Sequence, residues 1–252
     1  MKIFLPDNFI FHLFSDSLPA TIRQQVIFKP SGLISASISE IDAVVGIIPT
    51  IDLIFHKDFF ISSKFGVAFE GQLSTTYLYF KSESKKISDL ILSGDVSSFE
   101  PIIAKILFKE LYDIEIEIRI EQYPELIKNE NSIISGDYNF SSGLFKKGIS
   151  LAEEMSDFLA LPFVNFILAS KDENLLNSFQ NSLLGISDEI YSSVEEDKLL
   201  LSFNDDTNEF IKSKISSIVF DFEQNEIDGI NHLLLLPYYH GMVKEIVELK
   251  LV

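Results

Sequence analysis

The sequence of 252 residues contains no cysteine and no tryptophan, and Arg23 and Arg119 are its only arginines. Without cysteine the chain can form neither a disulfide nor a thiolate-ligated zinc site, and thiol catalysis is excluded. A protein without disulfides is compatible with any compartment, so this absence does not by itself locate the protein.

Positive charge is also scarce. The chain has 38 acidic residues against 20 basic ones, which gives a formal net charge of -18. Nucleic acids and anionic membranes select for clustered Lys and Arg, so neither is an expected partner. An anionic ligand would have to be held by local hydrogen-bond donors.

Long apolar runs are absent as well. No window approaches the roughly 18 apolar residues of a membrane-spanning helix. Pro6, Asp7 and Asn8 interrupt the N-terminal apolar run before a secretory signal could form. We therefore expect a soluble, cytoplasmic protein. Its hydrophobic content of 46% is enough for a substantial core, in one large domain or two of ordinary size.

Common catalytic motifs are missing. The chain contains no P-loop and no GxGxxG, GxSxG or HExxH motif, which disfavours kinases, dinucleotide enzymes and the common hydrolases. His232 and His240 lie eight positions apart, with no carboxylate at ligand spacing. We expect no metal site and no cofactor.

The clearest local pattern present is the segment 150–170, SLAEEMSDFLALPFVNFILAS. Ser150 and Glu153 have the spacing of a capping box, which begins a helix. Pro162 is a helix stop, and the apolar run 163–169 that follows indicates a central strand. The helix is predicted from apolar residues at helical spacing, namely Leu151, Met155, Phe158 and Leu159. A helix that leads into a central strand favours an open α/β sheet.

The rest of the chain alternates between strand and helix patterns in the same way. Strands are predicted at 2–5, 25–28, 42–48, 65–82 with a turn at Gly71, 115–120, 132–135 and 249–252. Helical patterns lie at 9–14, 32–41, from about 101 to 111, 171–194, 205–218 and 231–247. Asp42 fits a turn residue between a helix and a strand.

The segment 150–170 resembles the signature of the chorismate dehydratase family of the futalosine route to menaquinone, a branch of the type II periplasmic-binding-protein fold. Met155 stands where the family has Trp, and Ala160 where it has Gly. The resemblance extends to about residue 170 and is also clear at 42–53 and 66–80. The residues that fit the signature are Leu151, Glu153, Glu154, Leu161, Pro162, Phe163, Val164, Phe166 and Ala169.

The resemblance implies a two-lobed α/β fold with a ligand cleft between the lobes. The first lobe would comprise residues 1–81 and 170–252, and the second 82–169, joined by two crossing segments. The polar stretch at 81–86 fits the first boundary. The family's activity is a cofactor-free loss of water, catalysed by a carbon-oxygen lyase.

Site residues follow from the same resemblance. Asn8 and Thr75 match positions that would orient a carboxylate substrate and assist catalysis, and Gly136 with Asp137 favours the dehydratase over the related dihydroxynaphthoate synthase. Strand alternation allows Ser74 and Thr76, or Thr75 alone, to face one side. The candidate ligand-binding residues are Ser74, Thr76, Ser97, Ser98, Gly136 and Asp137.

Departures from the family concentrate at the expected site. Gln72 replaces a Pro, and Glu100 and Pro101 stand where the family has a Thr-Ser pair. Glu100 has two interpretations. Its charge could repel an incoming carboxylate, by roughly 3 kcal/mol at about 5 Å and an effective dielectric of ~20. Alternatively, it folds back onto the Ser97 amide as a helix cap and leaves Ser97 and Ser98 facing the cleft.

Two functions are therefore compatible with the sequence. One is a divergent dehydratase that binds a small carboxylate in the cleft. The other is a non-catalytic ligand-binding or structural member of the fold with an altered or filled cleft. The 23 Phe and 8 Tyr residues provide enough bulk to fill such a cleft.

Overall fold

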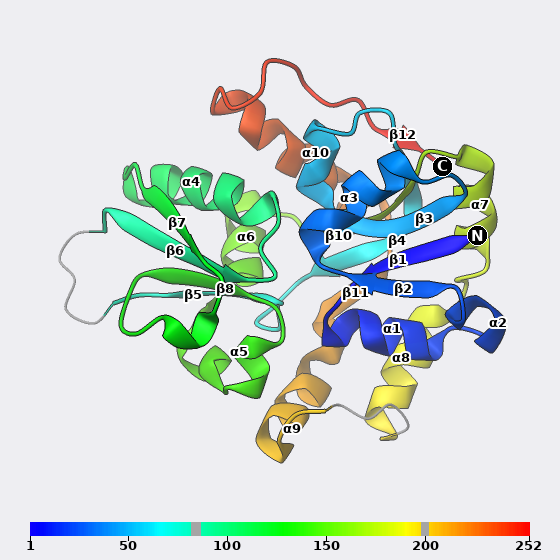
Figure 1. Cartoon of the computed structure of the whole chain (residues 1–252), viewed down its shortest axis with the longest axis horizontal. Coiled ribbons are helices and arrows are strands. Elements are labelled where there is room, and N and C mark those ends of the chain that lie inside the picture. Colours follow the sequence, from blue (N-terminus) through cyan, green and yellow to red (C-terminus); the bar gives the residue numbers. More distant parts are fainter. Residues whose placement is uncertain (82–86, 198–201) are drawn as a thin grey trace.

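The computed structural model describes residues 1–81, 87–197 and 202–252, and Figure 1 shows two lobes side by side, each built on its own sheet. The sheet of the first lobe has seven strands in the described part. Their order is β11 (Ile218–Asp221), β4 (Phe60–Phe69), β10 (Phe163–Ser170), β3 (Val44–Pro49), β1 (Lys2–Pro6) and β2 (Val26–Lys29), with β12 (Lys250–Leu251) paired to β4. β1 runs parallel to β2 and β3, whereas β10 is antiparallel to both β3 and β4.

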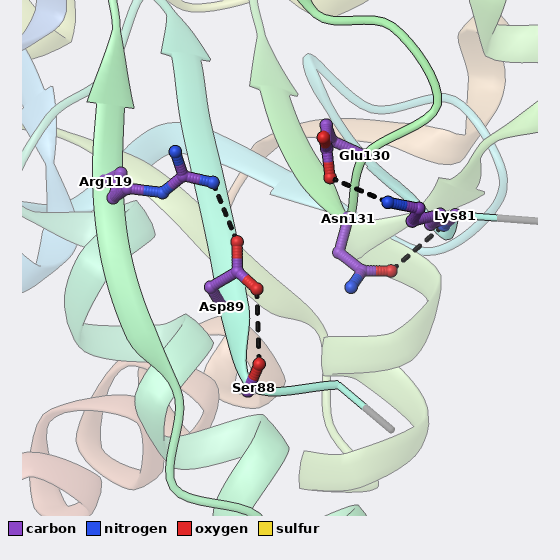
Figure 2. Close-up of polar contacts among 6 residues, drawn as sticks. All are labelled: Lys81, Ser88, Asp89, Arg119, Glu130 and Asn131. Carbon is purple, nitrogen blue, oxygen red and sulfur yellow. Dashed lines mark hydrogen bonds and ion pairs between the residues drawn. The ribbon is translucent and has the colours of Figure 1, made fainter. Parts of the chain in front are cut away.

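The sheet of the second lobe has five strands among the described residues. Their order is β7 (Glu117–Glu121), β6 (Asp89–Gly94), β8 (Ser132–Ser135), β5 (Thr76–Tyr79) and β9 (Ile149–Ser150). At its rim, Arg119 of β7 donates to Asp89 of β6 at 2.8 Å, and the Lys81 ammonium lies 3.6 Å from Glu130 (Figure 2). Both pairs are exposed on the surface, where ion pairs contribute little stability.

Helices cover both sheets. Those of the first lobe are α1 (Phe9–Ser17), α2 (Ala20–Arg23), α3 (Ser31–Glu40), α7 (Glu173–Asn181), α8 (Ile186–Glu195), α9 (Asp205–Lys214) and α10 (Gln224–Tyr239), with the 3-10 turns η1 (Thr50–Ile54) and η4 (Ile215–Ser217). Those of the second lobe are α4 (Phe99–Tyr112), α5 (Tyr138–Ser141) and α6 (Leu151–Leu159), with η2 (Pro124–Leu126) and η3 (Leu144–Lys147). No described helix is long and apolar enough to cross a membrane.

The helix and strand predicted in the segment 150–170 are confirmed. The Ser150 hydroxyl accepts a hydrogen bond from the Glu153 amide at 3.3 Å, and α6 is followed by its C-cap residue Ala160 in the left-handed conformation with φ of 52°. β10 is buried along its whole length between β3 and β4. One half of the capping box is absent, because within the described chain the Glu153 carboxylate does not bond back to the Ser150 amide.

The chain passes from one sheet to the other before each of the expected lobe boundaries, at 81/82 and 169/170. β5 already belongs to the second sheet, and β10 already belongs to the first. The first crossing begins with the exposed polar residues Glu70 and Gln72 and continues through Leu73, Ser74 and Thr75, which are buried. The stretch at 81–86 on which the boundary was placed lies, apart from residue 81, outside the described residues.

Other element predictions need correction. The strand predicted at 65–82 with a turn at Gly71 is broken around that turn into two strands, β4 and β5, which belong to different sheets. The final helix spans Gln224–Tyr239, so it begins before the predicted start at 231, ends before 247 and contains Pro237. The helix predicted at 205–218 ends at Lys214, and the buried apolar residues after it lead into β11. Asp42 lies in the bend before β3, as expected of a turn residue.

Candidate functional site

The candidate site lies where the carboxyl ends of strands from the two lobes meet. Asn8 follows β1 and Asp52 follows β3 in the first lobe, whereas Asp95 follows β6 and Asp137 follows β8 in the second. Ligands of open α/β sheets bind at such strand ends. Hydrogen bonds between the lobes show that these ends are in direct contact.

Asp137 joins the second lobe to the start of α1. Its Oδ1 accepts a hydrogen bond from the Phe9 amide at 3.0 Å, and so caps a helix of the other lobe. Asn8 is the residue before this helix, but its side chain makes no capping bond. The Asn8 side chain is buried, and its Oδ1 has no hydrogen-bond partner among the described residues.

Asp95 joins the second lobe to the start of α3. One carboxyl oxygen accepts from the Ser31 amide at 2.8 Å, and the other from the Ser31 hydroxyl at 2.5 Å. The backbones are also close here, because a Cβ added to Gly32 would lie 3.2 Å from the Val96 carbonyl oxygen. Asp95 therefore caps α3 in the way that Asp137 caps α1.

Asp52 forms a third link. Its carboxyl accepts hydrogen bonds from the Ser35 hydroxyl in its own lobe and from the Ser98 hydroxyl in the other. The adjacent Thr50 is fully buried, and its hydroxyl has no partner in the described part of the chain. On the outer side, the His240 ring lies 3.0 Å from Glu110 and connects the end of α10 with α4.

Glu100 caps a helix, which is the second of the two alternatives that the sequence left open. One carboxyl oxygen accepts from the Ser97 amide at 2.7 Å and from the Ser97 hydroxyl at 2.9 Å, so the side chain is folded back as a cap. The other oxygen accepts from the Ser135 hydroxyl at 2.8 Å. Neither hydroxyl expected to face the cleft is left over, because Ser97 bonds Glu100 and Ser98 bonds Asp52.

Three consecutive hydroxyl-bearing residues follow at the first crossing, namely Ser74, Thr75 and Thr76. Their hydrogen bonds mainly stabilise the local backbone. The Ser74 hydroxyl donates to the Thr76 carbonyl and accepts from the Thr76 amide, both at 3.0 Å. The Thr76 hydroxyl pairs with Ser135 at 2.9 Å. The Thr75 carbonyl accepts from the Gly136 amide at 2.7 Å.

Asn8 and Thr75 are connected through the hydrogen bonds of their neighbours. Phe9, next to Asn8, bonds Asp137, and Gly136, next to Asp137, bonds Thr75. Gly136 has φ of +92°, which favours glycine, and brings the loops of Asp95 and Asp137 together. The sequence-predicted residues are therefore neighbours. Most of their polar groups are bonded to other protein groups, whereas the Asn8 Oδ1 has no partner among the described residues.

Electrostatics at this interface are acidic. Burial raises the pKa of the Asp137 carboxyl to about 6, and burial also raises the pKa values of Asp52, Asp95 and Glu100. The charged neighbours that influence them are His12, His56, Asp7 and the carboxyls themselves, with no lysine or arginine among these described groups. No described cluster of acidic and His side chains is arranged to hold a metal ion.

Aromatic side chains close one side of the interface. The Phe9 ring lies 4.9 Å from Phe140 of the second lobe, and both contact Phe203, at 5.8 Å and 5.7 Å. Further along the C-terminal segment, Phe210 of α9 packs 4.6 Å from Phe145. Residues 203–210 therefore bridge the lobes, and the aromatic bulk noted in the sequence fills this side.

Sequence reasoning missed Asp52 and Asp95 as interface residues. Asp52 follows the strand predicted at 42–48, and that position is the signal that could have identified it. Asp95 follows β6, for which no strand was predicted. Their partners come from the opposite lobe, so the pairing itself has no signal in local sequence. The contribution of α9 was missed for the same reason.

No protein-family profile and no curated protein sequence matches the chain. Solved structures do match. Protein AF1704 from Archaeoglobus fulgidus is 11% identical, with a TM-score of 0.66, over 96% of this chain and 98% of that chain. The periplasmic aliphatic sulphonate binding protein SsuA from Escherichia coli is 10% identical, with a TM-score of 0.67, over 98% and 89%. The alkanesulfonate-binding protein SsuA from Xanthomonas axonopodis pv. citri, bound to MOPS, is 10% identical, with a TM-score of 0.65, over 98% and 95%. The chain thus has the two-lobed type II periplasmic-binding-protein-like fold.

Proposed function

We propose that this chain is a non-catalytic, small-ligand-binding member of the two-lobed fold, in which internal carboxyls have replaced a carboxylate ligand between the lobes. The observation that carries the proposal is the capping of α1 and α3 by Asp137 and Asp95 of the opposite lobe. Helix N-termini are ready-made anion sites. Here both are occupied by side chains of the protein itself.

The charge of the interface supports this proposal. A dicarboxylate such as chorismate would enter a region that already holds four carboxyls, with Asp52 and Glu100 buried and Asp95 and Asp137 half-buried. An unpaired buried anion is costly, and no described lysine or arginine bonds these carboxyls. A small-ligand role is retained because the similar Xanthomonas SsuA binds MOPS and the E. coli SsuA binds aliphatic sulphonates.

Chemical rescue tests the proposal. In Asp95→Ala the Ser31 amide and hydroxyl lose their acceptor, so we expect acetate to bind there and raise the melting temperature of the variant more than that of the wild type. Matched chloride controls remove the general effect of salt. Asp89→Ala, which removes an exposed carboxyl, is the control variant and should show no acetate-specific gain. Equal acetate effects in wild type and Asp95→Ala would overturn the proposal.

A divergent dehydratase of menaquinone biosynthesis is the second candidate function. It is favoured by the buried Oδ1 of Asn8, which has no hydrogen-bond partner among the described residues and is connected to Thr75 through the hydrogen bonds of Phe9 and Gly136. A buried acceptor without a partner costs about 1–3 kcal/mol, and a substrate hydroxyl would satisfy it.

Incubation with chorismate separates the two candidates. Product is followed by chromatography for the wild type and for Thr75→Ala. Turnover that is lost in Thr75→Ala would establish the dehydratase and refute the non-catalytic proposal. Folded wild-type protein that leaves chorismate unchanged supports the non-catalytic proposal.

A further inference from the structure

A separate cavity of about 480 Å³ lies where the second lobe meets α9, away from Asn8 and the interlobe carboxyls. Its volume falls within the range of small-molecule sites. Tyr77 of β5, Phe145 of η3 and Phe210 of α9 supply its aromatic lining, and Lys146 and Glu153 supply its charges. Phe145 and Phe210 also form the aromatic contact at the edge of the interlobe interface, whereas Tyr77, Lys146 and Glu153 take no part in the interlobe hydrogen bonds described above.

Glu153 is the polar group that the fold leaves unused. Its amide bonds Ser150, but its half-buried carboxylate makes no hydrogen bond or ion pair with any described residue. The capping-box spacing of Ser150 and Glu153 predicts that the Glu153 carboxylate accepts a hydrogen bond from the Ser150 amide, and that bond is not formed. The carboxylate is therefore available to a ligand in the cavity.

The other charge of the cavity is already neutralised. The Lys146 ammonium lies 3.3 Å from an Asp206 carboxylate oxygen on α9, and its side chain is half exposed at the rim. The ring of Phe145 packs 4.6 Å from Phe210 and 6.4 Å from Tyr77. Aromatic faces beside an unpaired carboxylate are the chemistry that recognises organic cations. The net charge of -18 also raises the local concentration of cations.

We propose that this cavity binds a small organic cation, with its ammonium group at Glu153 and its apolar body against Phe145, Phe210 and Tyr77. The inference rests on the proposed small-ligand role, but not on the interlobe carboxyls. It adds the site and the chemical class of the ligand.

The test compares two probes with the same aromatic body and opposite charge, phenethylamine and 3-phenylpropionate, by isothermal titration calorimetry. We expect phenethylamine to bind the wild type and phenylpropionate to bind at least tenfold more weakly. Glu153→Gln should weaken phenethylamine binding at least tenfold, and Phe210→Ala should weaken it as well. The matched control is Glu154→Gln, which removes the neighbouring carboxylate and should leave binding unchanged.

Two results would overturn the site: no phenethylamine binding to folded wild type, or equal affinity in the wild type and Glu153→Gln. Because the Glu153 side chain makes no bond within the described protein, Glu153→Gln should fold normally, which circular dichroism checks. Asp95→Ala should leave amine binding unchanged. Failure of the amine site is thus distinguishable from failure of the interlobe proposal, which is judged by acetate rescue and chorismate turnover.

Discussion

The contact between Asp95 and Ser31 is expected to hold the two lobes together in the absence of ligand. Asp95→Ala removes two hydrogen bonds, of 2.8 Å and 2.5 Å, and the carboxylate at the start of α3. Hydrogen bonds to charged groups contribute roughly 1.5–3 kcal/mol each, and a carboxylate at a helix N-terminus about 0.3–1 kcal/mol. The cost of burying the carboxyl opposes these gains, as its raised pKa indicates. A net loss of about 2 kcal/mol for the closed arrangement is a reasonable expectation, or roughly a 30-fold change in the equilibrium between closed and open lobes.

The lack of cysteine makes this change measurable. Glu40→Cys in the first lobe and Glu125→Cys in the second introduce two exposed attachment points into a chain with no other thiol. Spin labels at these positions report the distance between the lobes by pulsed electron paramagnetic resonance. We expect one narrow distance distribution for the wild type, and a second, longer component for Asp95→Ala.

The control for this experiment is Asp89→Ala. It removes an exposed carboxylate that pairs with Arg119 inside the second lobe, as Figure 2 shows. An exposed pair of this kind contributes about 0–1 kcal/mol, and its loss should not alter the distance distribution. If the distributions of Asp95→Ala and the wild type coincide while both are folded, the Asp95 contact does not hold the lobes and the reasoning fails.

Three further predictions concern stability. The pKa of Asp137 is raised from 3.8 to about 6, so the folded protein favours the protonated carboxyl. The contribution of this carboxyl to the free energy of unfolding is fully present below about pH 3.8 and is lost as the pH rises through 6. Because of this group, the free energy of unfolding of the wild type, measured with urea, should fall by roughly 3 kcal/mol between about pH 4 and pH 7, and Asp137→Asn should remove that fall. An unaltered pH dependence in Asp137→Asn would contradict this. Gly94 has φ of +86°, and a Cβ there would lie 2.0 Å from the Ser135 carbonyl oxygen, so Gly94→Ala should destabilise by more than about 2 kcal/mol. Gly143→Ala, at φ of +71° with open space around it, should cost only about 1 kcal/mol, and equal losses would refute the steric argument. Phe140→Ala empties the centre of the aromatic cluster and should cost about 3–5 kcal/mol in the same assay, whereas a loss below 1 kcal/mol would show that the cluster is not a packed core.

The fold could be predicted where local physics decides the structure. The Ser150 cap, Pro162 and the apolar run after it specify a helix, a stop and a buried strand, and all three are present. The crossing at residues 70–75 was missed because the more strongly charged stretch at 81–86 indicates a boundary. Glu70 and Gln72 are exposed at the crossing, but Leu73, Ser74 and Thr75 are buried, so only part of this connection is exposed to water and polar.

Part of the candidate site could be predicted from the sequence, and part of it depends on tertiary packing. Resemblance alone singled out Asn8, Thr75 and Asp137, and the structure connects them through hydrogen bonds made by Phe9 and Gly136. The roles of Asp52 and Asp95 depend on which groups of the opposite lobe meet them, and that depends on tertiary packing. The sequence also could not decide whether Glu100 repels a ligand or caps a helix. That depends on tertiary packing as well, because the hydroxyl of the distant residue Ser135 donates a hydrogen bond to Glu100.

The central claim is that the lobes are closed by their own side chains and require no ligand for closure. Small-angle X-ray scattering of the dialysed, ligand-free wild-type protein tests it most directly. The claim predicts a scattering curve that matches the closed structure and does not change when chorismate or acetate is added. A larger radius of gyration that contracts on addition of either anion would contradict it.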